Sequence, residues 1–206
     1  MVKIYILGGS GSGKTTLAEN LSSRLSIPHH DLDKNGWKNG NQWAAYVYDA
    51  IAIAEQPGWI AEGNYIIWTD PLFYQADYIV WLEISWPLAA WRILSRHILK
   101  SLRGINPYPG VKALFTLLKD TRTYYLEKVH SDPSVTESVR QYLEEHGADT
   151  ALADVETLII RWERCVKEIP FTADFVRMYL EKYQEKVLLI KNHADRERLL
   201  ELLTNR

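Results

Sequence analysis

The stretch "ILGGSGSGKTTLAENL", Ile6 to Leu21, decides the fold class of this chain. Its residues Gly8, Gly13, Lys14 and Thr15 satisfy the pattern G-x-x-x-x-G-K-[ST], with a hydrophobic run before it and a helical pattern after it, as a genuine match requires. Glycines permit tight turns and let backbone N–H groups approach phosphate oxygens, and the start of the helix adds the positive end of its dipole. The stretch therefore predicts a phosphate-binding loop (P-loop).

The P-loop also predicts a nucleotide and a metal ion as cofactors. By this pattern Lys14 reaches the β- and γ-phosphates of ATP, and Thr15 holds Mg²⁺. The residues that we expect to contact the nucleotide are Gly8, Gly9, Ser10, Gly11, Ser12, Gly13, Lys14, Thr15 and Thr16. The alternative is a glycine-rich turn that binds no ligand.

Hydrophobic runs alternate with helical patterns along the chain. Strands are expected at Val2–Leu7, in a short run ending near Asp31, and at Gly58–Gly63, Asp77–Ile84 and Glu185–Lys191. This alternation predicts an α/β fold with a mostly parallel sheet covered by helices on both faces. The sequence has no internal repeat or Gly/Ser-rich linker, so we expect a single domain over residues 1–206 with a helical insertion at about 87–183.

Composition favours a globular protein that acts in the cytoplasm. Hydrophobic residues make up 47% of the chain and charged residues 24%, and no apolar run approaches the roughly 18 residues that a membrane span needs. We therefore expect a cytoplasmic location and no membrane partner. The net charge of −2 disfavours a nucleic-acid partner, but residues 92–128 carry eight basic and two acidic side chains, or +6, which leaves that partner open.

Three carboxylates are expected at the carboxyl edge of the sheet. Asp31 and Asp33 are two residues apart at the end of the second strand, and Glu62 ends the third. Asp31 and Glu62 are candidates to support Mg²⁺, and Asp33 to accept a proton from an acceptor hydroxyl. The alternative is that these carboxylates only cap turns.

A helix after the fourth strand carries a row of cations. Arg92, Arg96, Lys100 and Arg103 fall at i, i+4, i+8 and i+11 and share one face. The nearly opposite face is apolar, and we expect it to pack against the protein; its residues are Trp91, Leu94, Ile98 and Leu102. The cationic face is free to meet phosphates, unless it is an ordinary solvated face.

Several segments together resemble one family. They are the P-loop, "HDLD" (30–33), "WIAEGNY" (59–65), "WRILSR" (91–96) and "KVLLIKNHADRERLLELL" (186–203). These segments look like the P-loop kinase-like proteins labelled DNA topology modulation protein of FlaR type, which are similar to adenylate kinases. The resemblance covers about residues 1–103 and 184–203; residues 130–171 match nothing that we can place.

The resemblance implies a fold and two residue roles. The fold is a P-loop NTP hydrolase fold with a five-stranded parallel sheet of order 2-3-1-4-5. An acceptor-binding region would lie between strands two and three, and a mobile lid between strands four and five. Arg92 would lie against the adenine and Arg96 would contact the transferring phosphate, with Arg122 a weaker candidate.

The acceptor side lacks the cations that an already phosphorylated acceptor usually requires. No arginine occurs from Asp31 through Gln75, which favours a less charged acceptor hydroxyl over a nucleoside monophosphate. Aromatic side chains there are candidates to stack on a flat ring, or belong to the core: Trp37, Trp43, Tyr65 and Trp68. Asn64 is expected either to bind a hydroxyl or to cap a turn.

These observations predict an ATP- and Mg²⁺-dependent kinase of a small molecule, such as a nucleoside or nucleotide. Lys14, Asp33 and Arg96 are its expected catalytic residues, and Asp33, Trp37, Asn64 and Tyr65 its expected substrate-binding residues. Two alternatives stay open: a nucleotide-binding regulatory protein that acts on DNA, and a P-loop NTP hydrolase. A GTPase switch is disfavoured because "IKNHAD" (190–195) lacks the order N-K-x-D.

Overall fold

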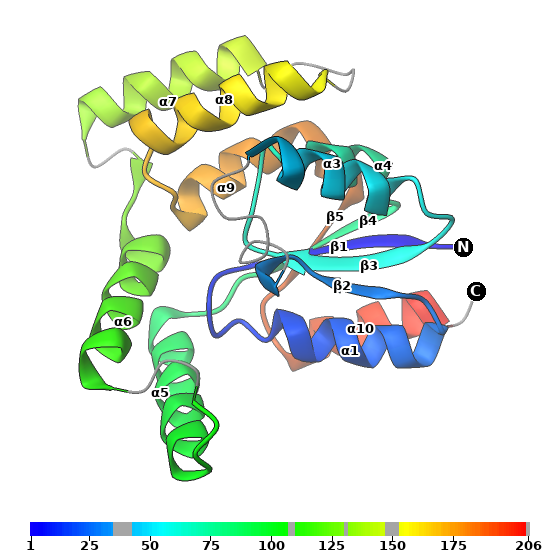
Figure 1. The fold of residues 1–206 in the computed structure, drawn as a ribbon, viewed down its shortest axis with the longest axis vertical. Coiled ribbons are helices and arrows are strands. Elements are labelled where there is room, and N and C mark those ends of the chain that lie inside the picture. Colours follow the sequence, from blue (N-terminus) through cyan, green and yellow to red (C-terminus); the bar gives the residue numbers. More distant parts are fainter. Residues whose placement is uncertain (35–42, 107–109, 130–131, 147–152, 205–206) are drawn as a thin grey trace.

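A computed structural model describes residues 1–34, 43–106, 110–129, 132–146 and 153–204 (Figure 1). Its centre is a five-stranded sheet of order β2-β3-β1-β4-β5, in which every pairing is parallel. The strands are β1 Lys3–Leu7, β2 His29–Asp31, β3 Trp59–Gly63, β4 Tyr78–Leu82 and β5 Val187–Ile190. The order and direction of the strands confirm the predicted P-loop NTPase α/β fold.

Helices cover both faces of the sheet (Figure 1). On one face lie α1 (Lys14–Leu25) and α10 (His193–Thr204), and on the other α3 (Trp43–Ala54), α4 (Asp70–Gln75) and α9 (Ala173–Leu180). Alternate residues of each strand point to opposite faces, so the sheet separates two hydrophobic clusters. In β1, Ile4 and Ile6 belong to the cluster under α1 and α10, whereas Tyr5 and Leu7 belong to the cluster under α3, α4 and α9.

A long helical insertion separates β4 from β5. It comprises α5 (Trp86–Leu102), α6 (Val111–Leu126), α7 (Pro133–His146), α8 (Val155–Glu168), α9 and the 3₁₀-helix η2 (Glu181–Lys186). Helices α5 and α6 form an antiparallel hairpin that projects away from the sheet, while α7 and α8 lie above α3 and α9 (Figure 1). The described elements of the insertion run from Trp86 to Lys186.

The α7–α8 pair, for which the sequence offered no interpretation, extends the core on the α3 side. Tyr142 of α7 and Leu158 of α8 are buried within the same hydrophobic cluster as α3. The rings of Trp43 and Trp162 lie 6.0 Å apart across the α3–α8 contact. This pair of helices is therefore packed on the body of the protein rather than suspended from it.

The apolar face of α5 does not pack as the sequence predicted. Trp91, Leu94, Ile98 and Leu102 are 66%, 36%, 48% and 80% exposed, so that prediction is wrong. The buried residues of α5 include Ile93 and Ala89, and Ala89 lies so close to the P-loop that a Cβ on Gly11 would come within 2.8 Å of its carbonyl oxygen. Only the side of α5 that meets α6 and the P-loop finds a packing partner among the described residues.

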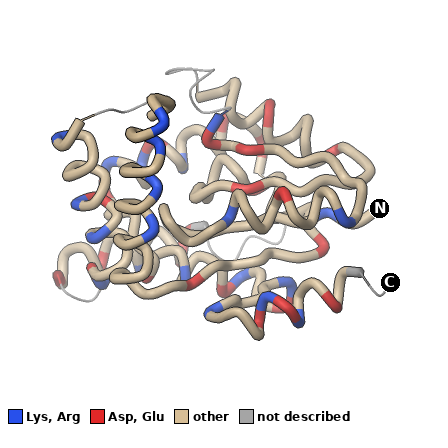
Figure 2. Tube along the Cα trace, turned by 90° about the horizontal axis from the view of Figure 1, so that it is seen from below, with Lys and Arg blue, Asp and Glu red and all other residues tan. Residues whose placement is uncertain are grey.

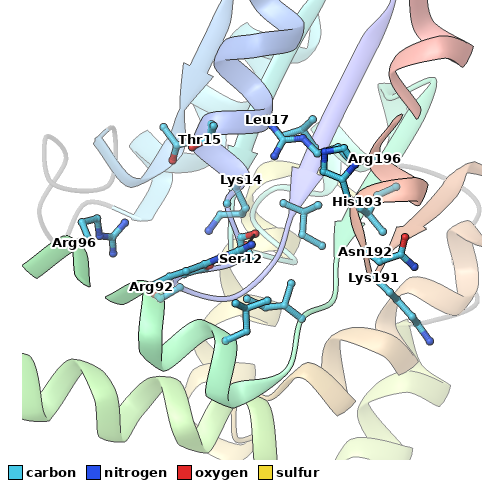
Figure 3. A pocket seen from close by; sticks show the side chains of 18 of the residues that line it. Ser12, Lys14, Thr15, Leu17, Arg92, Arg96, Lys191, Asn192, His193 and Arg196 are labelled. Carbon is cyan, nitrogen blue, oxygen red and sulfur yellow. Dashed lines mark hydrogen bonds between the residues drawn. The ribbon is translucent and has the colours of Figure 1, made fainter. Parts of the chain in front are cut away.

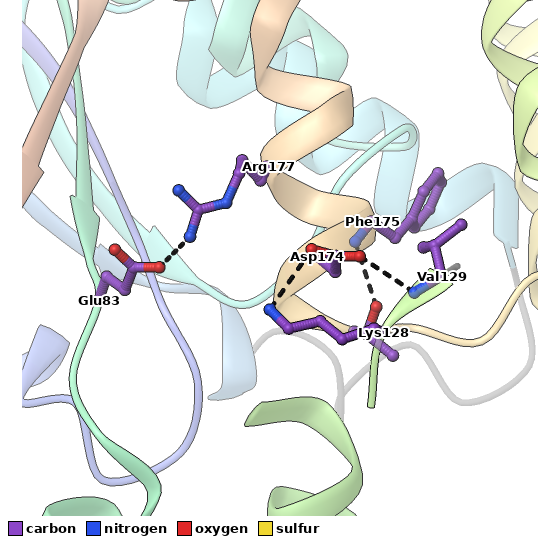
Figure 4. Close-up of polar contacts among 7 residues, drawn as sticks. Glu83, Lys128, Val129, Asp174, Phe175 and Arg177 are labelled. Carbon is purple, nitrogen blue, oxygen red and sulfur yellow. Dashed lines mark hydrogen bonds and ion pairs between the residues drawn. The ribbon is translucent and has the colours of Figure 1, made fainter. Parts of the chain in front are cut away.

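Helix α9 fixes the end of α6 to the body (Figure 4). The backbone N–H of Val129 donates to Asp174 Oδ2 at 3.0 Å, and Lys128 Nζ lies 3.5 Å from Asp174 Oδ1. One turn further along α9, Arg177 forms an ion pair with Glu83, which follows β4. The hairpin is therefore anchored at both ends, at the exit of β4 and at the start of α9.

The Asp174 anchor yields a prediction for stability. Asp174→Ala leaves the Val129 N–H without its acceptor and should lower the free energy of unfolding by about 1–2 kcal/mol. Lys128→Ala is the control, because an ion pair to a lysine that is 58% exposed is worth less than about 1 kcal/mol. Denaturant unfolding of both variants measures the difference; equal losses would contradict the anchoring role of the Val129 N–H.

Candidate functional site

The P-loop connects β1 to α1 in a conformation that requires glycine. Gly11 and Gly13 have φ angles of +81° and +97°, in the left-handed region where a side chain is disfavoured. Gly13 directly precedes α1, so the loop ends with the unpaired N–H groups of a helix N-terminus, which favour anions. The backbone of this loop therefore has a conformation that suits an anion.

Lysine 14 and threonine 15 begin α1 and meet a glutamate of β3. Thr15 Oγ1 donates to Glu62 Oε1 at 2.6 Å. Lys14 is only 8% exposed, and burial lowers the pKa of its ammonium group, an effect that the nearby Glu62 carboxylate partly offsets. The loop therefore holds a cation and a hydroxyl next to a buried carboxylate.

Glu62 is fully buried and incompletely hydrogen-bonded. Its Oε2 atom has no hydrogen-bond partner among the described residues, and burial raises the pKa of its carboxyl group. His29 Nε2 is also unpartnered and lies 3.9 Å from Glu62 Oε1. A buried carboxylate oxygen beside a threonine hydroxyl suits Mg²⁺, which prefers oxygen ligands.

Protein carboxylates alone do not make a metal site. The described residues contain no group of three or more His, Cys, Asp or Glu side chains that could hold a metal ion. Mg²⁺ typically keeps several waters and binds through one or two carboxylates together with substrate phosphates. The donors at Thr15 and Glu62 fit that kind of site.

Asp31 and Asp33 differ in their surroundings. Asp31 Oδ1 accepts the backbone N–H groups of Asp33 and Lys34 at 3.1 and 3.3 Å, and Asp31 Oδ2 lies 3.2 Å from Lys34 Nζ. Asp31 thus caps the turn after β2, which was the alternative to a metal role. Asp33 is exposed and lines the cavity described next.

A cavity of about 680 Å³ lies over the P-loop. Figure 3 shows Arg96 on one side of it, Arg196, His193 and Asn192 on the other, and Lys14 between them. Of the expected nucleotide residues, it is lined by Ser10, Gly11, Ser12, Gly13, Lys14, Thr15, Thr16 and Arg92. The cavity therefore gathers expected phosphate ligands from the P-loop and cations from α5 into one space.

Arg92 contacts the P-loop itself. Its Nη1 atom donates to the carbonyl oxygens of Gly11 and Ser12 at 3.2 and 3.0 Å. In a trans peptide the C=O and N–H bonds point in opposite directions, so a side chain that holds the carbonyl also fixes the direction of the N–H. Arg92 thus helps to fix the orientation of the loop peptides, a contact that the sequence did not predict.

Gly8 and Gly9 support the loop from outside the cavity. A Cβ on Gly8 would come within 2.8 Å of the carbonyl oxygen of Leu82, and one on Gly9 within 2.5 Å of the Tyr124 ring. The hydroxyl of Tyr125 lies 3.4 Å from the carbonyl oxygen of Ser10, to which it donates. The last turn of α6 therefore packs directly on the P-loop.

Residues after β5 form a wall of the cavity that sequence reasoning missed. This wall consists of Lys191, Asn192, His193 and Arg196. These residues follow the carboxyl end of a parallel strand, and the same criterion had identified Asp31 and Glu62. Applied to the fifth strand, it would have identified the wall as well. Lys191 is held by Glu83, whose Oε2 atom lies 3.4 Å from Lys191 Nζ.

The acceptor candidates after β3 lie outside this cavity. Trp68 is buried in the core, and the ring of the half-buried Tyr65 lies 5.1 Å from it. Asn64 Oδ1 is buried and has no hydrogen-bond partner among the described residues, which leaves it free for a hydroxyl. Trp37 lies outside the described residues.

The loop that carries these candidates is strained. Ile67 has a φ of +75°, which is unusual for a β-branched residue, and the N–H of Trp68 donates to the carbonyl oxygen of Ile66 at 3.1 Å. Backbone strain of this kind is concentrated at functional sites. The strain at Ile67 is therefore consistent with a functional role of the segment after β3.

Comparison with known proteins supports the fold. No family model matches the chain, and no curated protein matches it in sequence. A crystal structure of an uncharacterized protein from Eubacterium ventriosum is similar over 100% of both chains, with 11% identity and a TM-score of 0.51. This likeness concerns the fold alone.

Two solved kinases are more distant in structure. A putative kinase from Chloroflexus aurantiacus is 22% identical over 57% of this chain and 77% of its own, with a TM-score of 0.38. A shikimate kinase from Acinetobacter baumannii, in complex with shikimate, is 17% identical over 81% of this chain and 93% of its own, with a TM-score of 0.40. At these scores the two likenesses carry no argument about activity.

The buried Glu62 carboxyl predicts a pH-dependent stability. Because burial raises its folded-state pKa above the ordinary value of a glutamate, the stability that it contributes is complete below that ordinary pKa and is lost as the pH rises through the folded-state pKa. Glu62→Gln removes this titration. The variant should therefore unfold at a higher temperature than the parent at neutral pH without Mg²⁺ or nucleotide, and the difference should shrink as the pH is lowered.

Thermal unfolding over a pH series measures this effect. Glu55→Gln is the matched control, because Glu55 is exposed, and it should change the free energy of unfolding by no more than about 0.5 kcal/mol throughout. A Glu62→Gln difference that does not vary with pH would show that the buried charge is not its source.

Proposed function

We propose that this protein is an ATP- and Mg²⁺-dependent kinase that transfers the γ-phosphate of ATP to a hydroxyl group of a small molecule. The observation that carries the proposal is the shared cavity of Lys14, Asp33 and Arg96. A cation at the P-loop, a carboxylate after β2 and a second cation on α5 are the three parts that phosphoryl transfer needs. The proposal includes a cytoplasmic location and a single domain.

The nucleotide would be held at both of its ends. The P-loop N–H groups and Lys14 bind the phosphates, while the wall after β5 and Arg92 are positioned to enclose the base. Thr15 and Glu62 would hold Mg²⁺, with Asp31 as a more distant support. When bound, Mg²⁺ supplies positive charge that neutralises the β- and γ-phosphate oxygens.

Transfer requires a base and a charge stabiliser. Asp33 accepts the proton of the acceptor hydroxyl. The hydroxyl oxygen attacks the γ-phosphorus, the bond between that phosphorus and the bridging oxygen breaks, and ADP leaves. Arg96 then faces the oxygens of the moving group, over which the negative charge is spread. Because Arg96 belongs to α5, movement of the hairpin would bring this charge in and exclude water.

The acceptor is proposed to be a small hydroxyl compound, such as a nucleoside or nucleotide. Asn64, with its unpartnered oxygen, Tyr65 and Trp37 are the proposed contacts, together with Asp33. The lack of arginine between Asp31 and Gln75 favours an acceptor without a phosphate of its own. A relation to DNA topology modulation proteins of FlaR type is retained as part of this proposal.

Lys14→Ala tests the proposal together with an acceptor panel. The protein is incubated with ATP, Mg²⁺ and nucleosides, nucleotides or small alcohols, and ADP is measured. One class of acceptor should raise ADP formation about tenfold or more over the reaction without acceptor, and Lys14→Ala should abolish the gain because the β- and γ-phosphates lose their ammonium partner.

The control for this variant is Lys34→Ala, whose side chain is 79% exposed and lies outside the cavity. It should transfer phosphate at close to the parental rate. Turnover that no acceptor increases would indicate a hydrolase instead, and full turnover by Lys14→Ala would refute the P-loop assignment.

The two aspartates after β2 should separate in kinetics. Asp33→Asn removes the proposed base and should lower kcat by roughly 10²-fold, with little change in the KM for ATP. Asp31→Asn, the matched control, should mainly raise the Mg²⁺ concentration needed for half-maximal rate. If both variants show small and equal effects on kcat and on the Mg²⁺ requirement, the two aspartates only cap turns.

A further inference from the structure

The α5–α6 hairpin exposes apolar side chains to solvent. Leu102 is 80% exposed, Phe115 67%, and Trp91 and Val111 66% each. We define the hairpin surface by its exposed apolar residues outside the cavity: Trp91, Leu94, Ile98, Leu99, Leu102, Ile105, Val111, Phe115, Leu117 and Leu126. Extensive exposed apolar surface marks a site of interaction with a protein or a membrane.

Cations accompany these apolar residues, and they lack partners. Figure 2 shows lysine and arginine gathered along the two hairpin helices. Five exposed cations on the hairpin form no ion pair with any residue that the structure describes: Lys100 and Arg103, which share the cavity-side face of α5 with Arg92 and Arg96, and Lys112, Lys119 and Arg122, which belong to α6. Elsewhere the pattern differs, since Arg140 of α7 and Arg164 of α8 are each paired with two glutamates.

On α6 the apolar and cationic residues occupy one face. Val111, Phe115, Arg122 and Leu126 fall at i, i+4, i+11 and i+15, which places them along a single stripe, with Lys119 beside it. A helix that presents aromatic and aliphatic side chains together with lysine and arginine is typical of the interface between a membrane and water. The apolar part enters the boundary of headgroups and acyl chains, and the cations meet lipid phosphates.

We propose that the hairpin surface docks on a bilayer that contains anionic lipids. None of the described helices is long and apolar enough to cross a membrane, so the hairpin would lie on the surface. The expectation of no membrane partner rested on the lack of a spanning segment, which does not address a surface of this kind. The negative cytoplasmic leaflet supplies the charge that the three unpaired cations of α6 lack: Lys112, Lys119 and Arg122.

Two other occupants fit the hairpin surface less well. A symmetric contact with a second copy would bring the same unpaired cations against each other, because such an interface uses the same patch on both subunits. A nucleic acid would neutralise the cations but would leave the aliphatic side chains in water. Of these three occupants, only an anionic bilayer would contact both the apolar side chains and the cations favourably.

Docking leaves the nucleotide cavity accessible. Arg92 and Arg96 line that cavity, whereas Trp91, Ile98 and Leu102 lie on a different face of α5 at 100° per residue. The proposal is therefore independent of the proposed kinase activity. It connects the same helix to two surroundings, the cavity on one face and the bilayer on another.

Vesicle flotation of the whole protein tests the proposal. The probes are vesicles of phosphatidylcholine alone and of phosphatidylcholine with an equal amount of phosphatidylglycerol. The bound fraction should be about tenfold higher on the mixed vesicles and should fall as salt is added. Leu102→Asp combined with Phe115→Asp should lower binding to mixed vesicles about tenfold, because both side chains are exposed and their loss removes apolar contact without disturbing the core.

The matched control is Leu202→Asp, an exposed leucine on α10 that is 43% accessible and far from the hairpin in sequence. It should bind mixed vesicles like the parent, and all variants should keep the parental unfolding temperature. The proposal fails if the parent does not bind mixed vesicles, or if the double variant binds them as well as Leu202→Asp. It also fails if the double substitution instead abolishes a dimer detected by light scattering, or if DNA retains the protein and vesicles do not.

Discussion

The structure depends on one constraint, the parallel alignment of all five strands. Because every strand runs in the same direction, the residues that follow the strands meet at one edge of the sheet. The P-loop follows β1, Asp33 follows β2 and Lys191 follows β5. Glu62 is the penultimate residue of β3. Residues that are far apart in the sequence thus share one cavity edge without any dedicated scaffold.

The same edge concentrates an electrostatic cost. Glu62 is fully buried with one oxygen unpartnered, and Lys14 next to it is nearly buried. A buried carboxylate with an unpartnered oxygen destabilises the protein unless a ligand binds that oxygen. The single hydrogen bond from Thr15 does not fully offset the cost of removing the Glu62 carboxylate from water. Such an arrangement is consistent with an edge that is shaped for phosphate and a divalent cation rather than for the stability of the empty protein.

Local patterns account for the parts of the fold that the sequence predicted well. The P-loop and the strand positions follow from short motifs and from the alternation of elements, which are properties of neighbouring residues, whereas the strand order was implied by the family resemblance. The position of Asp33 at the cavity followed from its place after β2, and that of Arg96 was implied by the resemblance. The contact of Arg92 with Gly11 and Ser12 could not be predicted, because it depends on the distance between α5 and the P-loop. The solvent exposure of Trp91 and Leu102 was missed for a related reason: helical periodicity identifies an apolar face but not whether another element covers it.

The wall after β5 has a consequence for how the protein is made. β4 and β5 are neighbours in the sheet, yet the whole helical insertion is synthesised between Leu82 and Val187. A nascent chain emerges N-terminus first, so the P-loop leaves the ribosome before the insertion, and the wall residues Lys191 to Arg196 leave after it. The cavity is therefore completed only after the whole insertion has been translated, and a chain that is released before β5 carries a P-loop that has no opposite wall.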